Sequence, residues 1–176
     1  MILRVNASKF ISAAACKAKR DIRFYLEGVY LAVNGDAVGT DGHCLCKVSD
    51  AFTAPDGFNG AIIDLRAKVP PKCEIIEFCT ETGTARFFVY IYRQIEIAQF
   101  SVLDSRFPDY NRVIPVKRCA LDAVAVDVEI LAKAAKVFHK LKLKHVRIEF
   151  SEVNGSMIVT NPAIVGVVMV VMPCRL

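Results

Sequence analysis

The sequence predicts an α+β fold built from three strand–helix–strands units, with the helices on one face of antiparallel sheets. Three observations favour this class. Apolar residues recur at helical spacing in two separate segments. Short runs rich in β-branched and aromatic residues flank these segments, and Asn-Gly dipeptides at 34–35 and 154–155 mark tight hairpin turns.

The first unit covers about residues 1–52. Its expected elements are a strand over 2–5, a helix that starts at Asn6 or Ser8 and runs to about Arg20, and strands over 24–33 and 37–49. Asn and Ser side chains accept hydrogen bonds from the free N–H groups at a helix start, so either residue can cap this helix.

The second unit covers about residues 60–115 and follows a loop rich in Gly, Pro and Asn. Its expected elements are a strand over 61–64, a helical turn over 65–69, and strands over 74–79, 85–93 and 95–103. The helical turn is expected to end at Pro70-Pro71, because proline cannot continue a helix.

The third unit begins near Leu121, and Asp127 can cap a helix that runs to about Leu141. One face of this helix is apolar and the opposite face is mostly cationic; the two sets are Ile130, Ala134, Val137 and Leu141, and Glu129, Lys133, Lys136 and Lys140. Strands over 145–150, 156–160 and 164–172 complete the unit. In the first of these strands Val146, Ile148 and Phe150 are expected to point inward.

Composition excludes several classes of protein. Hydrophobic residues make up 54% of the 176 residues, which argues against disorder. The N-terminal segment lacks the continuous apolar stretch of a secretory signal, and the longest apolar run is shorter than the ~20 residues that span a bilayer, so we expect a cytoplasmic protein without membrane contact. The seven cysteines contain no Cys-x-x-Cys pair, so free and mostly buried thiols are expected and no metal site.

Three segments, taken together, resemble the β subunit of bacterial DNA polymerase III, the sliding clamp. Residues 24–30 followed by 39–45, which contain Thr40-Asp41-Gly42-His43, are similar to two strands of the clamp's middle domain. Residues 107–115, Phe-Pro-Asp-Tyr-Asn-Arg-Val-Ile-Pro, are similar to the junction between its middle and last domains. Residues 170–176 are similar to its Val-Val-Met-Pro-Met-Arg-Leu ending.

This resemblance implies a DNA-clamp-like architecture in a shortened form. Residues 1–115 correspond to a complete middle domain of two units, and residues 116–176 to the second half of a last domain. The clamp's first domain and half of its last domain have no counterpart. A clamp has twelve such units, so four chains of three units would restore a ring, although dimers are the commoner assembly.

The resemblance also implies that the chain binds duplex DNA. Clamps line their hole with helices, and lysines there contact phosphates without reading sequence. The residues expected to face DNA are Lys9, Lys17, Arg20, Arg23, Lys133, Lys136 and Lys140. A solvated cationic face is the alternative for any single helix.

The other implied site is a pocket for short hydrophobic peptide motifs of a polymerase or clamp loader. Its expected residues are Leu26, Thr40, Gly42, His43, Leu45, Pro108, Arg112, Val113, Ser156, Val170, Val171, Met172, Pro173, Arg175 and Leu176. Two positions depart from the family, since Cys44 stands where Arg is usual and Cys174 where Met is usual. Both changes shrink a side chain, which puts affinity and partner choice in doubt.

The leading hypothesis is a non-enzymatic processivity factor of DNA replication that self-associates around or along duplex DNA and needs no cofactor. One alternative is a clamp mimic that forms no ring and captures clamp-binding peptides or host clamp subunits, as a phage or another mobile element could encode. Another is an enzyme that uses His43 or a cysteine, but the sequence has no phosphate loop, paired catalytic carboxylates or nucleophile elbow.

Overall fold

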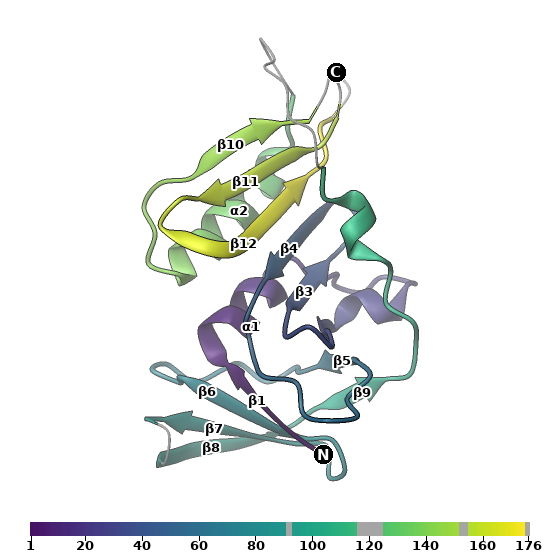
Figure 1. Cartoon of the computed structure of the whole chain (residues 1–176), viewed down its shortest axis with the longest axis vertical. Coiled ribbons are helices and arrows are strands. Elements are labelled where there is room, and N and C mark those ends of the chain that lie inside the picture. Colours follow the sequence, from purple (N-terminus) through teal and green to yellow (C-terminus); the bar gives the residue numbers. More distant parts are fainter. Residues whose placement is uncertain (91–92, 116–124, 152–154, 175–176) are drawn as a thin grey trace.

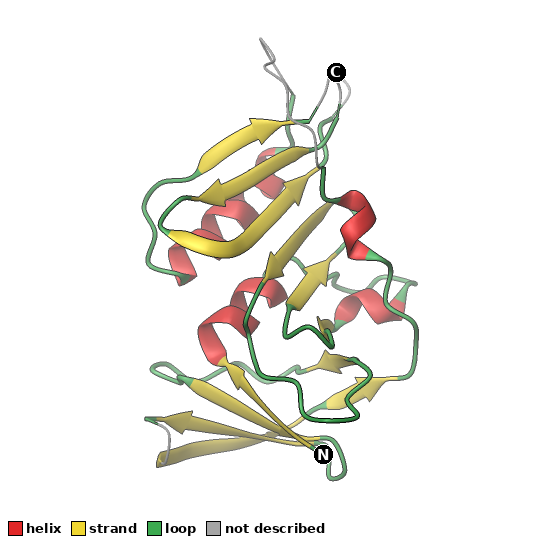
Figure 2. Cartoon of the chain, viewed as in Figure 1, coloured by secondary structure: helices red, strands yellow, loops and turns green. Residues whose placement is uncertain are grey.

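The computed structural model describes residues 1–90, 93–115, 125–151 and 155–174. Two antiparallel sheets, of order β1-β6-β7-β8 and β10-β11-β12-β4-β3-β2-β5-β9, pack with two α-helices in this part of the chain (Figures 1 and 2). The strands are β1 Ile2–Asn6, β2 Val29–Leu31, β3 Ala37–Thr40, β4 Cys44–Val48, β5 Ala61–Asp64, β6 Ile75–Cys79, β7 Thr84–Val89, β8 Arg93–Gln99, β9 Ser101–Leu103, β10 Arg147–Phe150, β11 Met157–Asn161 and β12 Ile164–Val171. The α-helices are α1 Ala7–Ala14 and α2 Val128–Lys140, and two 3₁₀ helices are η1 Phe24–Glu27 and η2 Tyr110–Val113. The predicted α+β class is confirmed.

The first two units exchange their opening strands. β1 pairs with β6 of the second unit, with Ile2 opposite Cys79, and β5 pairs with β2 of the first unit, with Val29 opposite Ile63. Each of the two sheets therefore contains strands from both units. The exchanged strands carry core residues, since Leu3 and Ile63 are fully buried.

Helix α1 is shorter than predicted. Asn6 caps its start by accepting a hydrogen bond from Lys9 N at 3.1 Å, as expected. The prediction of a helix to Arg20 is wrong, because the chain turns after Ala14 and Ala18 N donates to Leu26 O at 2.9 Å. The expected strand over 24–33 is also shorter, since η1 occupies its first half and β2 only its second half.

Glycine lets α1 lie directly on the sheet. A Cβ at Gly39 in β3 would stand 2.0 Å from Ala13 O, so only glycine permits this approach. The predicted single strand over 37–49 is two strands, β3 and β4, separated by a turn at Asp41 and Gly42. Asn34-Gly35 forms the expected turn between β2 and β3, with Gly35 at φ +85°.

The second unit has no helical turn at residues 65–69, which is a correction of the prediction. The two prolines that follow leave too few residues for a turn with helical hydrogen bonds. The predicted strand over 95–103 is divided into β8 and β9, with Phe100 between them.

The third unit joins the first through strand pairing. β12 pairs with β4, with Val170 opposite Leu45, and α2 packs against α1. Helix α2 agrees with the prediction, and the Asp127 carboxylate caps it by accepting a hydrogen bond from Glu129 N at 2.7 Å. The alternation predicted for this strand, β10, is wrong, because Val146 and Ile148 are 43% and 44% exposed, whereas Glu149 is half-buried like Phe150. This strand is the outermost of its sheet (Figure 1).

The main core lies between the helices and the sheets, and its largest fully buried side chains include Phe78, Phe87 and Phe138. Six cysteines of the described residues are free thiols, as expected, but only three of them are buried, and Cys119 lies outside the described residues. None of the helices described is long and apolar enough to cross a membrane. The division into domains at residue 115 stays a prediction, since the boundary falls beside residues that the structure does not describe.

Candidate functional site

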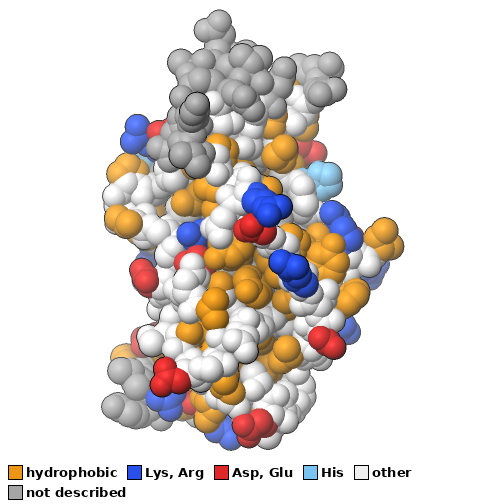
Figure 3. All heavy atoms as spheres, turned by 45° about the vertical axis from the view of Figure 1, so that its right-hand side comes forward, with side chains coloured by type: hydrophobic (Ala, Val, Ile, Leu, Met, Phe, Trp, Pro, Cys, Tyr) orange, Lys and Arg blue, Asp and Glu red, His pale blue; other side chains and the backbone are white. Residues whose placement is uncertain are grey.

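A cavity of about 250 Å³ lies where the first unit, the third unit and the connector after β9 meet. Hydrophobic side chains gather at the centre of the face that carries this connector (Figure 3). The cavity is lined by Arg23, Tyr25, Leu26, Thr40, Gly42, His43, Cys44, Leu45, Phe107, Pro108, Asp109, Tyr110, Val113, Val170 and Met172. The lining is therefore mostly apolar, with charged and polar groups at its margins.

The turn between β3 and β4 forms one wall. Thr40 Oγ1 donates a hydrogen bond to Cys44 O at 2.7 Å and accepts one from Gly42 N at 3.1 Å. Asp41 Oδ1 accepts hydrogen bonds from His43 N and Cys44 N, each at 2.9 Å. Gly42 has a φ of +87°, which side chains disfavour, and a Cβ there would meet the Arg23 guanidinium at 2.8 Å. The Thr-Asp-Gly segment is thus a rigid wall.

The end of β12 forms the opposite wall. Met172 N donates to His43 O at 3.2 Å, so the strand pairing of the two units continues to the rim of the cavity. Met172 is 47% exposed there, whereas Val170 beneath it is buried. Lys133 of α2 forms an ion pair with Asp41 and binds the third unit to the same turn.

The connector closes the cavity and is held by aromatic contacts. Phe107 stacks on Tyr30 with 4.9 Å between ring centroids and 9° between ring planes. The Tyr110 hydroxyl donates to the buried Asp36 carboxylate at 3.0 Å, and Lys47 pairs with the same carboxylate at 3.2 Å. Burial and the bond to Asp36 raise the pKa of Tyr110 to about 12.

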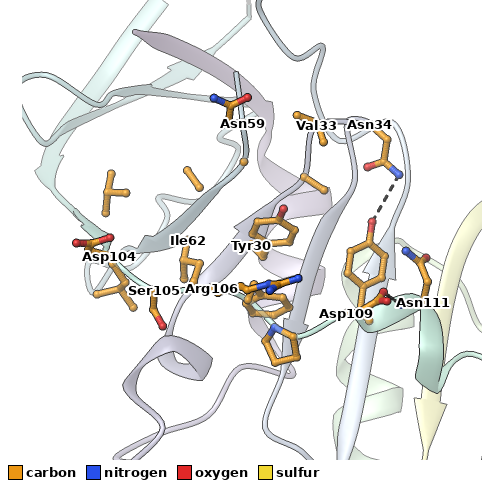
Figure 4. Close-up of a pocket in the computed structure, with 18 residues that line it drawn as sticks. Tyr30, Val33, Asn34, Asn59, Ile62, Asp104, Ser105, Arg106, Asp109 and Asn111 are labelled. Atoms are coloured by element: carbon orange, nitrogen blue, oxygen red, sulfur yellow. Dashed lines mark hydrogen bonds between the residues drawn. The ribbon is translucent and has the colours of Figure 1, made fainter. Parts of the chain in front are cut away.

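A second, more polar hollow of about 890 Å³ lies on the other side of the connector. Tyr30 of β2 and Arg106 and Asp109 of the connector lie around it (Figure 4). Asn34 Nδ2, also in its lining, donates a hydrogen bond to the Tyr110 hydroxyl at 3.5 Å. The aromatic residues of the connector thus separate two hollows of different chemistry.

Comparison with known proteins gives a consistent answer. No protein-family model matches the chain. The beta sliding clamp of Chlamydia pneumoniae is 29% identical over 144 residues, which cover 76% of this chain and 38% of that protein. The beta sliding clamp of Pseudomonas aeruginosa is 33% identical over 109 residues, which cover 56% of this chain and 28% of that protein.

Solved structures agree with these sequence matches. The DNA polymerase III subunit beta of P. aeruginosa matches all of this chain and 67% of its own, with a TM-score of 0.71 at 18% identity. The DNA polymerase sliding clamp of Bacillus subtilis matches all of this chain and 64% of its own, with a TM-score of 0.72 at 13% identity. The chain is similar in sequence to bacterial beta sliding clamps. It has the sliding-clamp fold, and it spans less than half the length of the curated clamps that it matches. These relatives are bacterial, and nothing in them supports an origin in a phage.

The structure brings together most of the pocket residues that the resemblance to clamps predicts. Nine of them line the cavity: Leu26, Thr40, Gly42, His43, Leu45, Pro108, Val113, Val170 and Met172. The part of these residues in peptide binding stays a prediction.

Four other predicted residues do not line the cavity. Arg112 pairs with Asp109 at 3.0 Å on the surface, and Val171 is buried in the main core. Ser156 precedes β11, and Pro173 lies beyond the rim. Arg175 and Leu176 lie outside the described residues.

The prediction missed six lining residues, namely Arg23, Tyr25, Cys44, Phe107, Asp109 and Tyr110. Four of them are direct neighbours of predicted residues, so their positions in the sequence could have been used to predict them; these are Tyr25, Cys44, Phe107 and Asp109. Tyr110 lies two residues from Pro108 and Arg112. Arg23 reaches the turn through a hydrogen bond from Nη2 to Asp41 O at 3.2 Å, which no sequence spacing indicates.

The charged groups at this site interact with other groups of the chain and stabilise its fold. Burial alone would raise the pKa of Asp41, but the Lys133 ammonium and the N–H groups of Cys44 and His43 outweigh it and lower that pKa. A hydrogen bond with Cys16, together with burial, raises the pKa of Cys44, so its thiol stays neutral and unreactive. Over the residues that the structure describes, no group of three or more His, Cys, Asp or Glu could hold a metal ion.

Several cations that were expected to face DNA have partners within the chain. Lys17 pairs with Asp64 at 3.3 Å, and Arg23 pairs with Asp21 at 2.7 Å. The Lys9 ammonium donates to two backbone oxygens in the loop after β4, and Lys133 pairs with Asp41. Arg20, Lys136 and Lys140 are exposed. DNA contact by any of these residues stays a prediction.

Proposed function

We propose that the chain is a clamp-like processivity factor of DNA replication that self-associates around or along duplex DNA and binds short hydrophobic peptide motifs of a polymerase or clamp loader. The observation that carries this proposal is the apolar cavity at the junction of the first unit, the third unit and the connector. It is formed by the three segments that resemble clamps, although these lie far apart in the sequence.

The cavity suits a peptide. Its volume is just below the range of about 300–1,000 Å³ that is usual for ligand pockets, so it accommodates a few side chains rather than a folded domain. The thioether of Met172 is flexible and polarisable, and it adapts to aliphatic or aromatic side chains. Cys44 leaves more space and one charge fewer than the Arg of clamps, so we expect weaker selection for acidic residues in the partner.

Peptide binding is tested with a fluorescent peptide that carries leucine and phenylalanine side chains. Met172→Asp and Val113→Asp place a carboxylate in the apolar cavity, and each is expected to weaken binding at least about tenfold. Val165→Asp is the matched control, because Val165 is 97% exposed and does not line the cavity. Unchanged affinity in both cavity variants would contradict the proposal.

DNA binding is tested through topology. A closed ring on circular DNA stays bound in high salt, but it slides off once the DNA is made linear, whereas a peptide-capturing mimic shows no such difference. The double variant Lys136→Glu, Lys140→Glu is expected to lower DNA retention, because it reverses two exposed cations. Lys68→Glu in the loop before β6 is the control. Equal retention on circular and linear DNA would argue against encirclement.

The lengths of the matches support a shortened last domain. The curated Pseudomonas clamp is more than twice as long as this chain, since 109 of its residues are only 28% of it. The structural match covers 67% of the solved Pseudomonas clamp, which is more residues than this chain has. Some clamp residues within the matched region therefore have no counterpart here. We infer that they are the first half of the last domain. Self-association follows, because the remaining half-domain has an open side.

A further inference from the structure

The open side of the third unit carries several exposed apolar side chains. On α2, Val128, Leu131 and Ala135 are exposed and lie one turn apart, on a different face from the buried Ile130 and Val137. Val146, which directly precedes β10, and Ile148 within it extend this surface, with exposed fractions of 43% and 44%. A shallow hollow lies between the helix and the segment that leads to the strand. Its apolar lining residues are Ala135, Phe138, Leu143 and Val146, and Lys136, His139, Lys140 and Lys144 also line it. We call this the α2–β10 surface.

An open strand edge runs beside this surface. Among the described residues β10 pairs only with β11 and is the last strand of the eight-stranded sheet. Its outer N–H and C=O groups can therefore pair with another strand. The third unit already joins the first in the same way within the chain. There, β12 pairs with β4, and α2 packs against α1.

The charges of α2 are complementary to themselves when the helix is reversed. Asp127 and Glu129 lie at its start, whereas His139 and Lys140 end it and Lys142 and Lys144 follow. Two copies of α2 packed antiparallel place the acidic start of each beside the basic end of the other, and their helix dipoles also oppose each other favourably. A parallel arrangement would bring like charges together.

We propose that the α2–β10 surface binds the same surface of a second copy of this chain around a two-fold axis. The axis is perpendicular to the sheet, so the two copies of α2 pack antiparallel and the two copies of β10 pair antiparallel. In the register centred on Ile148, each Ile148 lies opposite its own copy and Arg147 lies opposite Glu149. This inference deepens the self-association in the proposed function and rests on it.

The rival arrangement is head to tail. β8 is also an outer strand, with Ile95 and Ile97 exposed, and it could receive β10 of the next copy. That contact would join two different surfaces, and Ile148 would not lie opposite Ile148 of the other copy. The two arrangements therefore predict different cross-links.

The first experiment measures the mass of the full chain in solution by sedimentation equilibrium. Leu131→Asp and Ile148→Lys are each expected to halve the mass of the assembly, because each places a charge in the apolar contact. Val165→Asp, an equally exposed apolar residue of the same unit, is expected to keep the parent mass. A parent chain that is monomeric at micromolar concentration, or variants that keep the parent mass, would overturn the proposal.

The second experiment tests the symmetry. In a Cys174→Ser background, Ile148→Cys is treated with oxidised glutathione, which accepts the electrons and protons of the two thiols. Opposite residues of antiparallel strands have Cα atoms about 4.5–5.5 Å apart, within disulfide range, so a covalent dimer is expected. Val165→Cys is the control and is expected to stay uncross-linked. A cross-link that forms only when Ile148→Cys is mixed with Ile97→Cys supports the head-to-tail contact and rejects the two-fold one.

The outcome is distinguishable from failure of the proposed function. Leu131 and Ile148 do not line the cavity, so both variants are expected to bind the fluorescent peptide with parent affinity. Peptide binding with no assembly through this surface rejects only the further inference. Assembly without any peptide binding rejects the peptide-binding part of the proposed function and leaves the contact in place.

Discussion

At the scale of single residues, Asp41 carries out two structural tasks at once. One carboxylate oxygen closes the turn between β3 and β4, and the other accepts the ammonium of Lys133 from the third unit. The turn that shapes the cavity is therefore also the point that fixes the third unit beside it. Loss of this carboxylate should loosen both.

We expect Asp41→Asn to cost about 1–3 kcal/mol of folding stability at neutral pH, because it leaves Lys133 without its partner. The pKa of Asp41 is lowered from its ordinary value of 3.8, so its contribution is fully present above that value and is lost as pH falls through the folded pKa. Urea unfolding between pH 7 and pH 2 checks this. The exposed Asp56→Asn is the control; an equal acid dependence in the parent and Asp41→Asn would contradict the expectation.

Tyr110 likewise joins two segments, because its hydroxyl in the connector donates a hydrogen bond to Asp36 of the first unit. Tyr110→Phe removes the bond to Asp36 and is expected to destabilise the protein by about 1–2 kcal/mol. Because the folded pKa of Tyr110 is raised to about 12, the hydroxyl's contribution is present below pH 10 and is lost as pH rises from there towards 12. Phenolate absorbance during alkaline titration measures this, and an ordinary titration of every tyrosine would count against it.

At the scale of elements, both α-helices depend on an Asx residue before their first turn. Asn6 accepts from Lys9 N, and Asp127 accepts from Glu129 N. The caps fix the direction of two short helices that pack against each other where the first and third units join. A helix of eight residues such as α1 has little stability of its own, so it is held mainly by its contacts with β3 and β4.

Asn6→Ala and Asp127→Ala are each expected to lower the free energy of unfolding by about 1 kcal/mol, and together by about the sum, because the two caps do not share a partner. Chemical denaturation measures both effects. Asn59→Ala, in the loop before β5, is the control substitution and should have almost no effect. A clearly sub-additive double variant would show that the two caps are coupled through the helix pair.

At the scale of the whole molecule, the eight-stranded sheet crosses from the third unit through the first to β5 of the second. The exchanged strand β1 then connects the first unit to the four-stranded sheet. Among the described residues, no unit therefore has a sheet formed only by its own strands, because even β10, β11 and β12 of the third unit are continued by β4 of the first.

This continuity predicts cooperative unfolding of the full chain. Far-ultraviolet circular dichroism, which reports on all elements, and tyrosine fluorescence, which reports on the first and second units, should follow one transition. Every tyrosine lies between residues 25 and 110, so the two signals sample different parts of the chain. A separate early loss of helix signal would show that the third unit unfolds independently.

Sequence patterns predicted what depends on local periodicity and turn chemistry. Helix α2, with its Asp127 cap, and the Asn34-Gly35 hairpin are set by neighbours in sequence, and both were predicted. The early end of α1 was not, because it depends on the bond from Ala18 N to Leu26 O. In the cavity, the segments of the resemblance gave nine lining residues, whereas Arg23 arrives through a tertiary contact that no spacing indicates.

The exchange of β1 and β5 also constrains when the protein can fold during its synthesis. Ile2 must wait for Cys79, its partner in β6, to leave the ribosome before the first strand has a neighbour. At about 5–20 residues per second this delay is roughly 4–15 s, during which the buried side chains of β1 are exposed to water and to other nascent chains. We expect the emerging N-terminus to be a chaperone-binding segment for that interval.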